Sequence, residues 1–226
     1  MDSFAVLHRD EQCVVVHKPS GVPVHRSSEH RDAGVPLLQR TRDAVGMRVY
    51  PVHRLDRPVS GIVVFALSSA AAAGFQEALS SSACVKEYSA LVRGEIAEPG
   101  RSERPLTNRD TGRVQEALTE WEPQATWCVP VHGPLTLLQV RIHTGRRHQI
   151  RRHLAHARHA ILGDTTHGKG AVNRYMREQW GLQRIFLHAS RLSLVHPESG
   201  EALHLQSPLP ASLQRVLDAL ASQESG

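Results

Sequence analysis

The spacing of strand-like segments constrains the fold of this chain more than any other feature. Residues 4–8 and 13–18 form a candidate hairpin across the polar turn 9–12, and residues 185–195 and 202–206 flank another short turn. Such short connections join antiparallel neighbours, because parallel strands need a crossover of a dozen or more residues. With helices interspersed, the pattern predicts an α+β fold with a mixed, largely antiparallel central sheet, not a doubly wound one.

The remaining elements follow from periodicity and capping residues. Further strands are predicted at 48–52, 62–67, 85–92, 117–121 and 135–142. Helices are predicted at 36–45, 70–79, 147–156, 171–180 and 210–221. Residues 95–104 read as a linker, and the pattern stays weak as far as 133. We therefore interpret 95–133 as an insertion that carries substrate choice, within a single domain spanning 1–226.

Composition favours a polyanionic partner in a reducing compartment. Lys and Arg outnumber Asp and Glu by 27 to 22. Many of the 15 histidines lie near arginine, and their partial protonation would add to the positive electrostatic field. Cys13, Cys84 and Cys128 are scattered and include no Cys-x-x-Cys pair, so neither a disulfide framework nor a zinc knuckle is expected. No apolar run approaches the length of a membrane span. We expect a cytoplasmic protein.

The segment 53–61, His-Arg-Leu-Asp-Arg-Pro-Val-Ser-Gly, places one carboxylate between two arginines just before an apolar strand. Arg54 and Arg57 stay cationic at any working pH, and their field favours an ionised Asp56. An ionised, positioned carboxylate is a candidate nucleophile, and the arginines can also bind phosphate. The alternative is a turn clamped by a surface ion pair, which contributes about 0–1 kcal/mol.

The order of residues in 53–61 resembles the catalytic motif of the RluA family of pseudouridine synthases, which isomerise uridine in RNA. Val59 stands where that family usually carries Thr, a change that keeps the shape and loses a hydroxyl. Residues 18–21, Lys-Pro-Ser-Gly, also match the family's N-terminal motif. The resemblance implies the pseudouridine synthase fold, with Asp56 as the catalytic carboxylate.

A tyrosine on the strand 85–92 gives a second point of resemblance. By itself, Tyr88 is more often a half-buried packing residue than a functional one. In the family, a Lys-x-Tyr motif supplies a tyrosine that stacks on the target uracil and serves in proton transfer, and Lys86-Glu87-Tyr88 matches it. An aromatic face is also what recognition of a flipped base requires.

The densest basic cluster is 143–154, a run that resembles the family's third motif. If helical, Arg147 and Arg151 share a face and can grip phosphates; a solvated basic face is the alternative. The resemblance instead implies that Arg151 pairs with Asp56. It implies that Arg146 supports RNA or the active-site loop, and that Leu187 lies against the target base. We assign substrate contacts to Arg54, Arg57, Arg146, Arg147, His148 and Leu187.

The histidines at 153, 156 and 159 recur at three-residue spacing, which is typical of some metal sites. No carboxylate or cysteine completes a ligand set, so no metal is expected, and RNA contact and helix packing are the roles assigned. Residues 163–168 read as a loop in which phosphate cradling is an open alternative.

The resemblance implies an RNA pseudouridine synthase that needs no cofactor. Local sequence after the third motif is similar to the branch that modifies uridine 65 in the TΨC stem of tRNA, while ribosomal and dual-specificity members are the alternatives. A monomer without an S4-type RNA-binding domain is expected. Attack at ribose C1′, attack at uracil C6 and a glycal route remain open. A non-catalytic RNA-binding module and a histidine-dependent nuclease are rival hypotheses from other classes.

Overall fold

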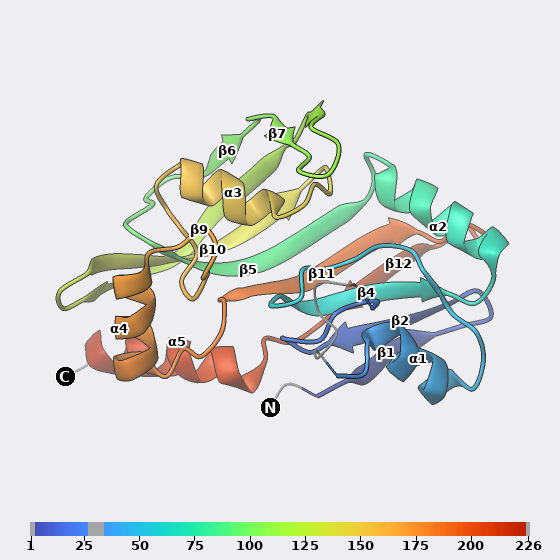
Figure 1. Ribbon diagram of the computed structural model, residues 1–226, viewed down its shortest axis with the longest axis horizontal. Coiled ribbons are helices and arrows are strands. Elements are labelled where there is room, and N and C mark those ends of the chain that lie inside the picture. Colours follow the sequence, from blue (N-terminus) through green and yellow to red (C-terminus); the bar gives the residue numbers. More distant parts are fainter. Residues whose placement is uncertain (1–2, 27–33, 225–226) are drawn as a thin grey trace. The chain divides into compact units, whose positions relative to one another are not determined.

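The computed structural model describes residues 3–26 and 34–224 (Figure 1). The chain divides into two compact units. The first unit comprises residues 2–86 and 189–208, and the second comprises residues 87–188 and 209–226. The chain therefore leaves the first unit once and returns to it for a single late segment, and each unit has its own core.

The first unit is organised around two completely buried strands. Its strands are β1 (Ala5–Arg9), β2 (Cys13–Lys18), β3 (Tyr50–Pro51), β4 (Ser60–Ala66), β11 (Leu187–Val195) and β12 (Ala202–Gln206). They follow the order β1-β2-β4-β11, with β3 beside β4 and β12 beside β11. The β1–β2, β2–β4, β3–β4 and β11–β12 pairings are antiparallel. Because β2 and β4 are buried throughout, they read as continuous apolar runs.

Two helices complete the first unit. Helix α2 (Ser69–Ser80) begins at Ser68, whose side chain accepts a hydrogen bond from the Ala71 N–H at 3.0 Å. Its Phe75 and Leu79 enter the core formed by the strands. Helix α1 (Leu37–Val45) ends at Gly46 in the left-handed conformation. Both helix ends agree with the sequence signals.

The second unit is a sheet with helices packed against it. Its strands β5 (Val85–Arg93), β10 (Gly133–Ile142), β9 (Thr119–Val129) and β6 (Gly100–Ser102) are neighbours in that order, and all three pairings are antiparallel. The short strands β7 (Leu106–Thr107) and β8 (Val114–Gln115) form a separate hairpin. Since β5 and β11 cross the boundary between the units, the first residues of β5 and the last of β11 belong to the first unit.

The helices of the second unit are α3 (Gln149–His156), α4 (Gly170–Trp180) and α5 (Ala211–Glu224). Helices α4 and α5 lie next to each other (Figure 1). Their Met176, Leu213 and Val216 form one apolar core with Leu91 of β5 and Trp127 of β9. Burial of each such side chain contributes roughly 1.5–3 kcal/mol, so this end of the sheet is firmly covered.

The prediction of a mixed, largely antiparallel sheet with helices is confirmed. The interpretation of 95–104 as a linker is wrong, because it contains β6, and the segment 95–133 also supplies most of β9, so it takes part in the sheet. Its substrate-selecting role and the single-domain organisation stay predictions. Within residues 3–26 and 34–224, no helix combines the length and apolar character that crossing a bilayer requires.

Candidate active site

The loop 53–61 lies between β3 and β4 and is fastened to the N-terminal Lys-Pro-Ser-Gly segment. The Gly21 N–H donates to the Arg57 carbonyl at 2.8 Å, and the Ser20 hydroxyl donates to the Pro58 carbonyl at 2.7 Å. These bonds join residues nearly forty positions apart. The two sequence motifs of the first unit are therefore joined by hydrogen bonds, and the earlier motif fixes the backbone of the later one.

Lys18 is the buried residue that connects these two motifs. Its side chain is fully buried, and its ammonium group donates to the Pro19 and Arg57 carbonyls, both at 3.0 Å. A buried ammonium group is costly unless it is hydrogen-bonded, and carbonyl oxygens are suitable acceptors. Lys18 thus holds the loop from inside the protein, a role that the sequence motif did not reveal.

The carboxylate-bearing residue of the loop is half-buried. Asp56 is intermediate in exposure, whereas Arg54 and Arg57 are exposed. The Val59 N–H donates to the Asp56 carbonyl at 3.0 Å, which closes a tight turn around Asp56. A fixed backbone is what a catalytic carboxylate needs, so the geometry is compatible with the predicted role.

The end of the loop is packed too closely to tolerate a side chain. Gly61 has φ +123°, and a Cβ at this position would collide with the backbone of Ala189 in β11. Val59 is 3% exposed, so its apolar side chain is packed inside the protein. The Gly61 position therefore serves the close approach of two strands beside the loop.

His53 is held neutral beside the loop. Burial and the positive charge of Lys86 lower the pKa of His53 to about 4, and its Nε2 accepts a hydrogen bond from the Val64 N–H at 3.0 Å. Burial is also the largest cause of the lowered pKa values of His153, His156 and His167. The expectation that partly protonated histidines add positive field is wrong for these four.

Tyr88 lies on β5 in the second unit. It is half-buried and stands opposite Val140 of β10 in the strand register. Asp56 belongs to the first unit, whereas Tyr88 and Arg151 belong to the second. The convergence of these three side chains on one site therefore stays a prediction.

Helix α3 begins later than the sequence indicated. His148 adopts a left-handed conformation with φ 55°, so the helix starts at Gln149 and leaves Arg147 outside. Arg147 is exposed and approaches the Asp110 carboxylate at 3.6 Å, whereas Arg151 is only 3% exposed. The alternative in which Arg147 and Arg151 share a phosphate-gripping helix face is therefore wrong.

Arg151 forms a two-point ion pair with Asp164. Its Nε lies 2.8 Å from Oδ2, and its Nη2 lies 2.9 Å from Oδ1. Burial alone would raise the pKa of the Asp164 carboxyl, but hydrogen bonds and charge from Arg151, with the Thr166 and His167 N–H groups, lower it. Asp164 is 1% exposed, and its carboxylate is already bonded, so it is a structural part of the loop 163–168. Phosphate binding by this loop stays an untested alternative.

The remaining residues of the basic motif fix the turn before α3. Gln149 accepts hydrogen bonds from the Thr144 hydroxyl at 2.7 Å and from the Arg146 N–H at 3.0 Å. Its amide nitrogen donates to the Leu118 carbonyl at 2.9 Å. The Arg146 side chain donates to the Glu116 carbonyl at 2.9 Å, and its support of RNA or of the active-site loop stays a prediction. The buried Gln149 had no assigned role in the sequence interpretation.

His153 is a packing residue. It is fully buried, and its two ring nitrogens lie 2.9 Å from the Thr119 hydroxyl and 2.9 Å from the Arg104 carbonyl. The ring of His148 reaches that of His167, with a nitrogen–nitrogen distance of 3.1 Å. Leu187 begins β11 and is 3% exposed, so protein atoms cover its side chain, and its contact with a base stays a prediction.

One group of potential metal ligands occurs within residues 3–26 and 34–224. The donor atoms of His8, Asp10 and Cys13 all lie within 4.8 Å of one another. Asp10 Oδ2 accepts hydrogen bonds from His8 Nε2 at 2.8 Å and Cys13 Sγ at 3.4 Å. Burial and the neighbouring charge of Asp10 raise the pKa of the Cys13 thiol. A protonated thiol donating to a carboxylate accounts for this cluster without an ion.

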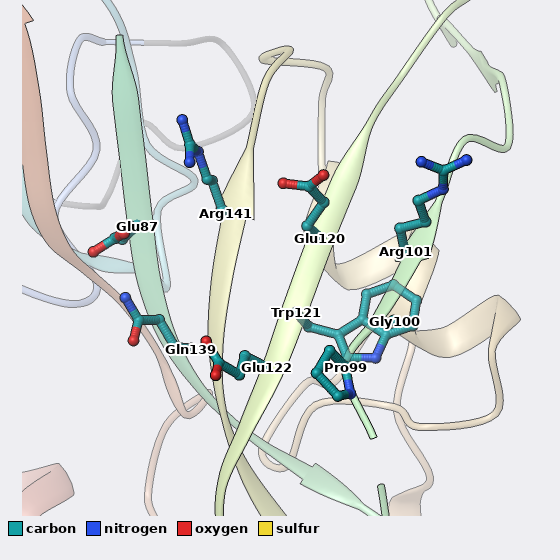
Figure 2. Close-up of a pocket in the computed structure, with 9 residues that line it drawn as sticks. All are labelled: Glu87, Pro99, Gly100, Arg101, Glu120, Trp121, Glu122, Gln139 and Arg141. Carbon is teal, nitrogen blue, oxygen red and sulfur yellow. The ribbon is translucent and has the colours of Figure 1, made fainter. Parts of the chain in front are cut away.

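A cavity of about 630 Å³ opens on the sheet of the second unit (Figure 2). Its charged lining residues are Glu87, Glu120, Glu122, Arg101 and Arg141. Arg141 stands between Glu87 and Glu120 in the strand register, so opposite charges alternate across the strands. Neighbouring residues on a strand face opposite sides, so this cavity lies on the side of β5 away from Tyr88. With three glutamates and two arginines, the lining does not favour binding of phosphate.

Comparisons with known proteins place these motifs in one family. Residues 12–156 match the family described as RNA pseudouridylate synthase. The chain is 37% identical over 237 residues to tRNA pseudouridine synthase C of Vibrio cholerae, covering 97% of each protein. It is 38% identical over 228 residues to tRNA pseudouridine synthase C of Salmonella typhi, covering 94% of this chain and 88% of that one.

Solved structures share the fold of this chain. Human RNA Pseudouridylate Synthase Domain Containing 4 has a TM-score of 0.74 at 24% identity, covering 96% of this chain and 92% of that one. Human RNA Pseudouridylate Synthase Domain Containing 1 also has a TM-score of 0.74 at 24% identity, with 99% and 95% coverage. At this identity the likeness establishes the fold alone.

Proposed function

The chain belongs to the RNA pseudouridylate synthase family and is therefore an isomerase of uridine in RNA, and from this premise we propose that its substrate is a cytoplasmic transfer RNA. Two relatives that match nearly the whole chain are named for tRNA. We further propose uridine 65 of the TΨC stem as the target, on the local sequence that follows the third motif.

The observation that carries the catalytic assignment is the fastening of the loop 53–61. The buried Lys18 ammonium group and the Gly21 N–H both bind the carbonyl of Arg57, the residue next to the half-buried Asp56. A binding surface for phosphate has no need of such an arrangement around a carboxylate. A catalytic carboxylate does need it, because small displacements of a reacting group lower the rate steeply.

In the proposed reaction, the target uridine leaves the helical stack at a cost of a few kcal/mol. Asp56 acts on the nucleotide, and the bond between N1 and C1′ breaks. The uracil turns while bound, C5 bonds to C1′, the C5 proton is lost, and N1 gains a proton. Tyr88 supports the base and assists removal of the C5 proton, and the exposed Arg54 steers the flipped nucleotide.

Arg151 is proposed to hold the Asp56 carboxylate while Asp164 orients Arg151. A guanidinium group has five N–H donors in a rigid plane, and the two-point pair with Asp164 employs two of them. One guanidinium group can therefore bind more than one carboxylate, and the resemblance of residues 143–154 to the family's third motif assigns Asp56 as the other. Asp164 then acts as a positioning residue, and the buried pair fixes the direction in which Arg151 points.

Tritium release from RNA labelled at uridine C5 tests the assignment, because the C5 proton is lost during the reaction. Wild-type protein is expected to release tritium from tRNA transcripts, and Asp56→Asn is expected to lower the single-turnover rate by at least roughly 1000-fold. The matched control is Asp218→Asn, which removes an exposed carboxylate on α5 outside the segments assigned to the site, and it should stay within about twofold of wild type.

Mapping of pseudouridine in the product then tests the position. Modification at uridine 65, and its loss in a transcript with cytidine there, supports the proposed target. Release from ribosomal RNA but not from tRNA would favour the ribosomal branch. Tight RNA binding with no release from either RNA would contradict the enzymatic assignment for these substrates.

A further inference from the structure

A second cavity, of about 660 Å³, lies in the first unit. It opens between the start of α1 and the chain entering β3, and apolar side chains line most of it. Its floor includes Leu38, Val49 and Tyr50. This volume is within the range of cavities that bind small organic ligands, and it is large enough for one nucleotide.

Three arginines surround this cavity, and none of the lining residues in the described part of the chain is acidic. Arg26, Arg42 and Arg48 are all exposed. Arg42 also binds the neighbouring Asp43, with nitrogen–oxygen distances of 3.0 and 2.8 Å, but both side chains of this pair are more than half exposed. Such a pair is weak in water, so the cavity retains a positive field. The cavity in Figure 2 differs in having three glutamates among its lining residues.

The cavity also presents planar groups. The Arg48 guanidinium lies 4.9 Å from the centre of the Tyr50 ring, in a cation–π arrangement. Aromatic rings and guanidinium planes are the surfaces on which unpaired bases stack. An apolar floor, an aromatic face and a positive rim together match the base and the phosphates of a nucleotide.

The register of β3 and β4 separates this cavity from the catalytic loop. Tyr50 stands opposite Ala66, at the far end of β4 from Ser60, where the loop 53–61 enters the strand. At about 3.3 Å per residue, six residues of β4 span roughly 20 Å. Asp56 is not among the lining residues. The cavity and the catalytic carboxylate are therefore separate places on the same unit.

We propose that this cavity binds an unpaired nucleotide of the substrate RNA, distant from the target uridine. The base takes the place of the Arg48 guanidinium on the Tyr50 ring, and Arg26, Arg42 and the displaced Arg48 bind the adjacent phosphates. This inference rests on the proposed function for the identity of the RNA. The cavity contributes to RNA affinity and leaves the chemical step unchanged.

Two variants test the stacking and the phosphate contacts separately. Tyr50→Leu keeps an apolar side chain and removes the aromatic face, and it is expected to weaken RNA binding roughly 5- to 100-fold. The double variant Arg26→Gln with Arg48→Gln is expected to lower the slope of log affinity against log salt by about 2, since each lost phosphate contact lowers it by about 1. The matched control is Arg9→Gln, an exposed arginine on β1 outside the cavity.

Single-turnover tritium release over a range of enzyme concentrations separates binding from chemistry. The cavity variants should raise the half-saturating concentration at least about fivefold with an unchanged maximal rate, whereas Arg9→Gln should stay within about twofold. Equal behaviour of the cavity variants and Arg9→Gln overturns the proposal. Absence of tritium release with RNA affinity still sensitive to Tyr50→Leu contradicts the proposed function and supports the cavity.

Cross-linking of wild-type protein to tRNA by ultraviolet light reads the same contact without any substitution. A nucleotide attached to a peptide that contains residues 48–51 supports the proposal, even if Tyr50→Leu fails to fold. Attachment to other peptides only, competed by unlabelled tRNA, overturns it. Free uridine monophosphate is a competitor for the cavity. If it suppresses the cross-link at 48–51 while the arginine double variant keeps the wild-type half-saturating concentration for tRNA, the cavity is a small-ligand site, and the proposal is overturned.

Discussion

Arg151 and Asp164 form a two-point ion pair in the interior of the second unit, with nitrogen–oxygen distances of 2.8 and 2.9 Å. Both side chains are almost fully buried, at 4% and 1% exposure. Removal of one member leaves the other charge buried without this partner. A pair of this kind therefore makes each residue dependent on the other, whatever its net contribution to stability.

The first prediction follows from this dependence. Asp164→Ala is expected to lower the free energy of unfolding by about 3–5 kcal/mol, because the Arg151 charge stays buried after its carboxylate partner is removed. The double variant Arg151→Met with Asp164→Ala should lose less than the sum of the single losses. Urea unfolding of the four proteins measures the coupling. The exposed pair Arg147–Asp110 is the control, and Arg147→Met should cost less than about 1 kcal/mol.

Strict additivity of the Arg151 and Asp164 effects would contradict this prediction. Activity measured well below the unfolding midpoint adds a second criterion. If Asp164 orients Arg151 toward the catalytic carboxylate, Asp164→Asn should lower the single-turnover rate in protein that is fully folded. A folded Asp164→Asn variant with the wild-type rate would leave the pair with a structural role only.

The second prediction concerns the lysine that fastens the catalytic loop. Lys18→Met preserves the approximate length of the side chain and removes the ammonium donor to the Pro19 and Arg57 carbonyls. The expected loss is about 2–4 kcal/mol in the free energy of unfolding. A loosened loop should also lower the single-turnover rate roughly 100-fold. Urea unfolding and tritium release measure the two effects.

Lys169→Met is the matched control for Lys18→Met, since Lys169 is exposed. It should stay within about 0.5 kcal/mol of wild type. A Lys18→Met protein with wild-type stability and rate would show that the buried ammonium group does not hold the loop.

The third prediction separates backbone strain from steric collision. Gly61 and Gly200 both have positive φ, at +123° and +73°, but of these two only Gly61 lies where an added Cβ would collide with other atoms. Gly200→Ala should therefore cost about 1–2 kcal/mol, from the left-handed conformation alone. Gly61→Ala should cost more than about 3 kcal/mol, because β4 must move away from Ala189. Chemical unfolding distinguishes the two, and equal costs would contradict the close approach of the strands.

Most helices and strands could be predicted because their signals come from residues that are neighbours in the sequence. Residues 13–18 form β2 at the predicted bounds, since a run of valines between polar turns needs no distant information. Ser68 and Gly46 marked helix ends through hydrogen bonds and conformations that neighbouring residues determine. The resemblance of 53–61 to a family motif located the candidate carboxylate.

The errors have a different origin, because they involve contacts between distant residues. The strand β9 is partly exposed and includes Pro123, so its pattern is weak, and pairing with β10 and β6 stabilises it. The late start of α3 follows from the left-handed His148, which no local pattern indicates. Asp164 lies thirteen positions beyond Arg151, and the role of Lys18 depends on a loop almost forty positions away.

The fourth prediction is a loss of stability on acidification in two ranges of pH. The pKa of His53 is about 4 in the folded protein, below its ordinary value of 6.5, so folding favours the neutral form. The unfolded chain then binds more protons between pH 6.5 and 4, and stability falls across this range as pH decreases. Because the side chain is half-buried, the contribution should be at most about 2–3 kcal/mol.

A second decline should occur at lower pH through the carboxyl groups. Burial opposes ionisation of Asp10, but hydrogen bonds from His8 and from the Cys13 and Gln12 N–H groups lower its pKa to about 2, against an ordinary value of 3.8. The pKa of Asp164 is also lowered. Stability from these groups is complete above about pH 4 and is lost as pH falls toward the folded pKa values. Urea unfolding from pH 7.5 to 3 measures both ranges, and His53→Gln should reduce the slope in the upper one only, where His153, His156 and His167 also contribute. An unchanged slope between pH 6.5 and 4 in His53→Gln would contradict the neutral buried histidine and assign that range to other groups.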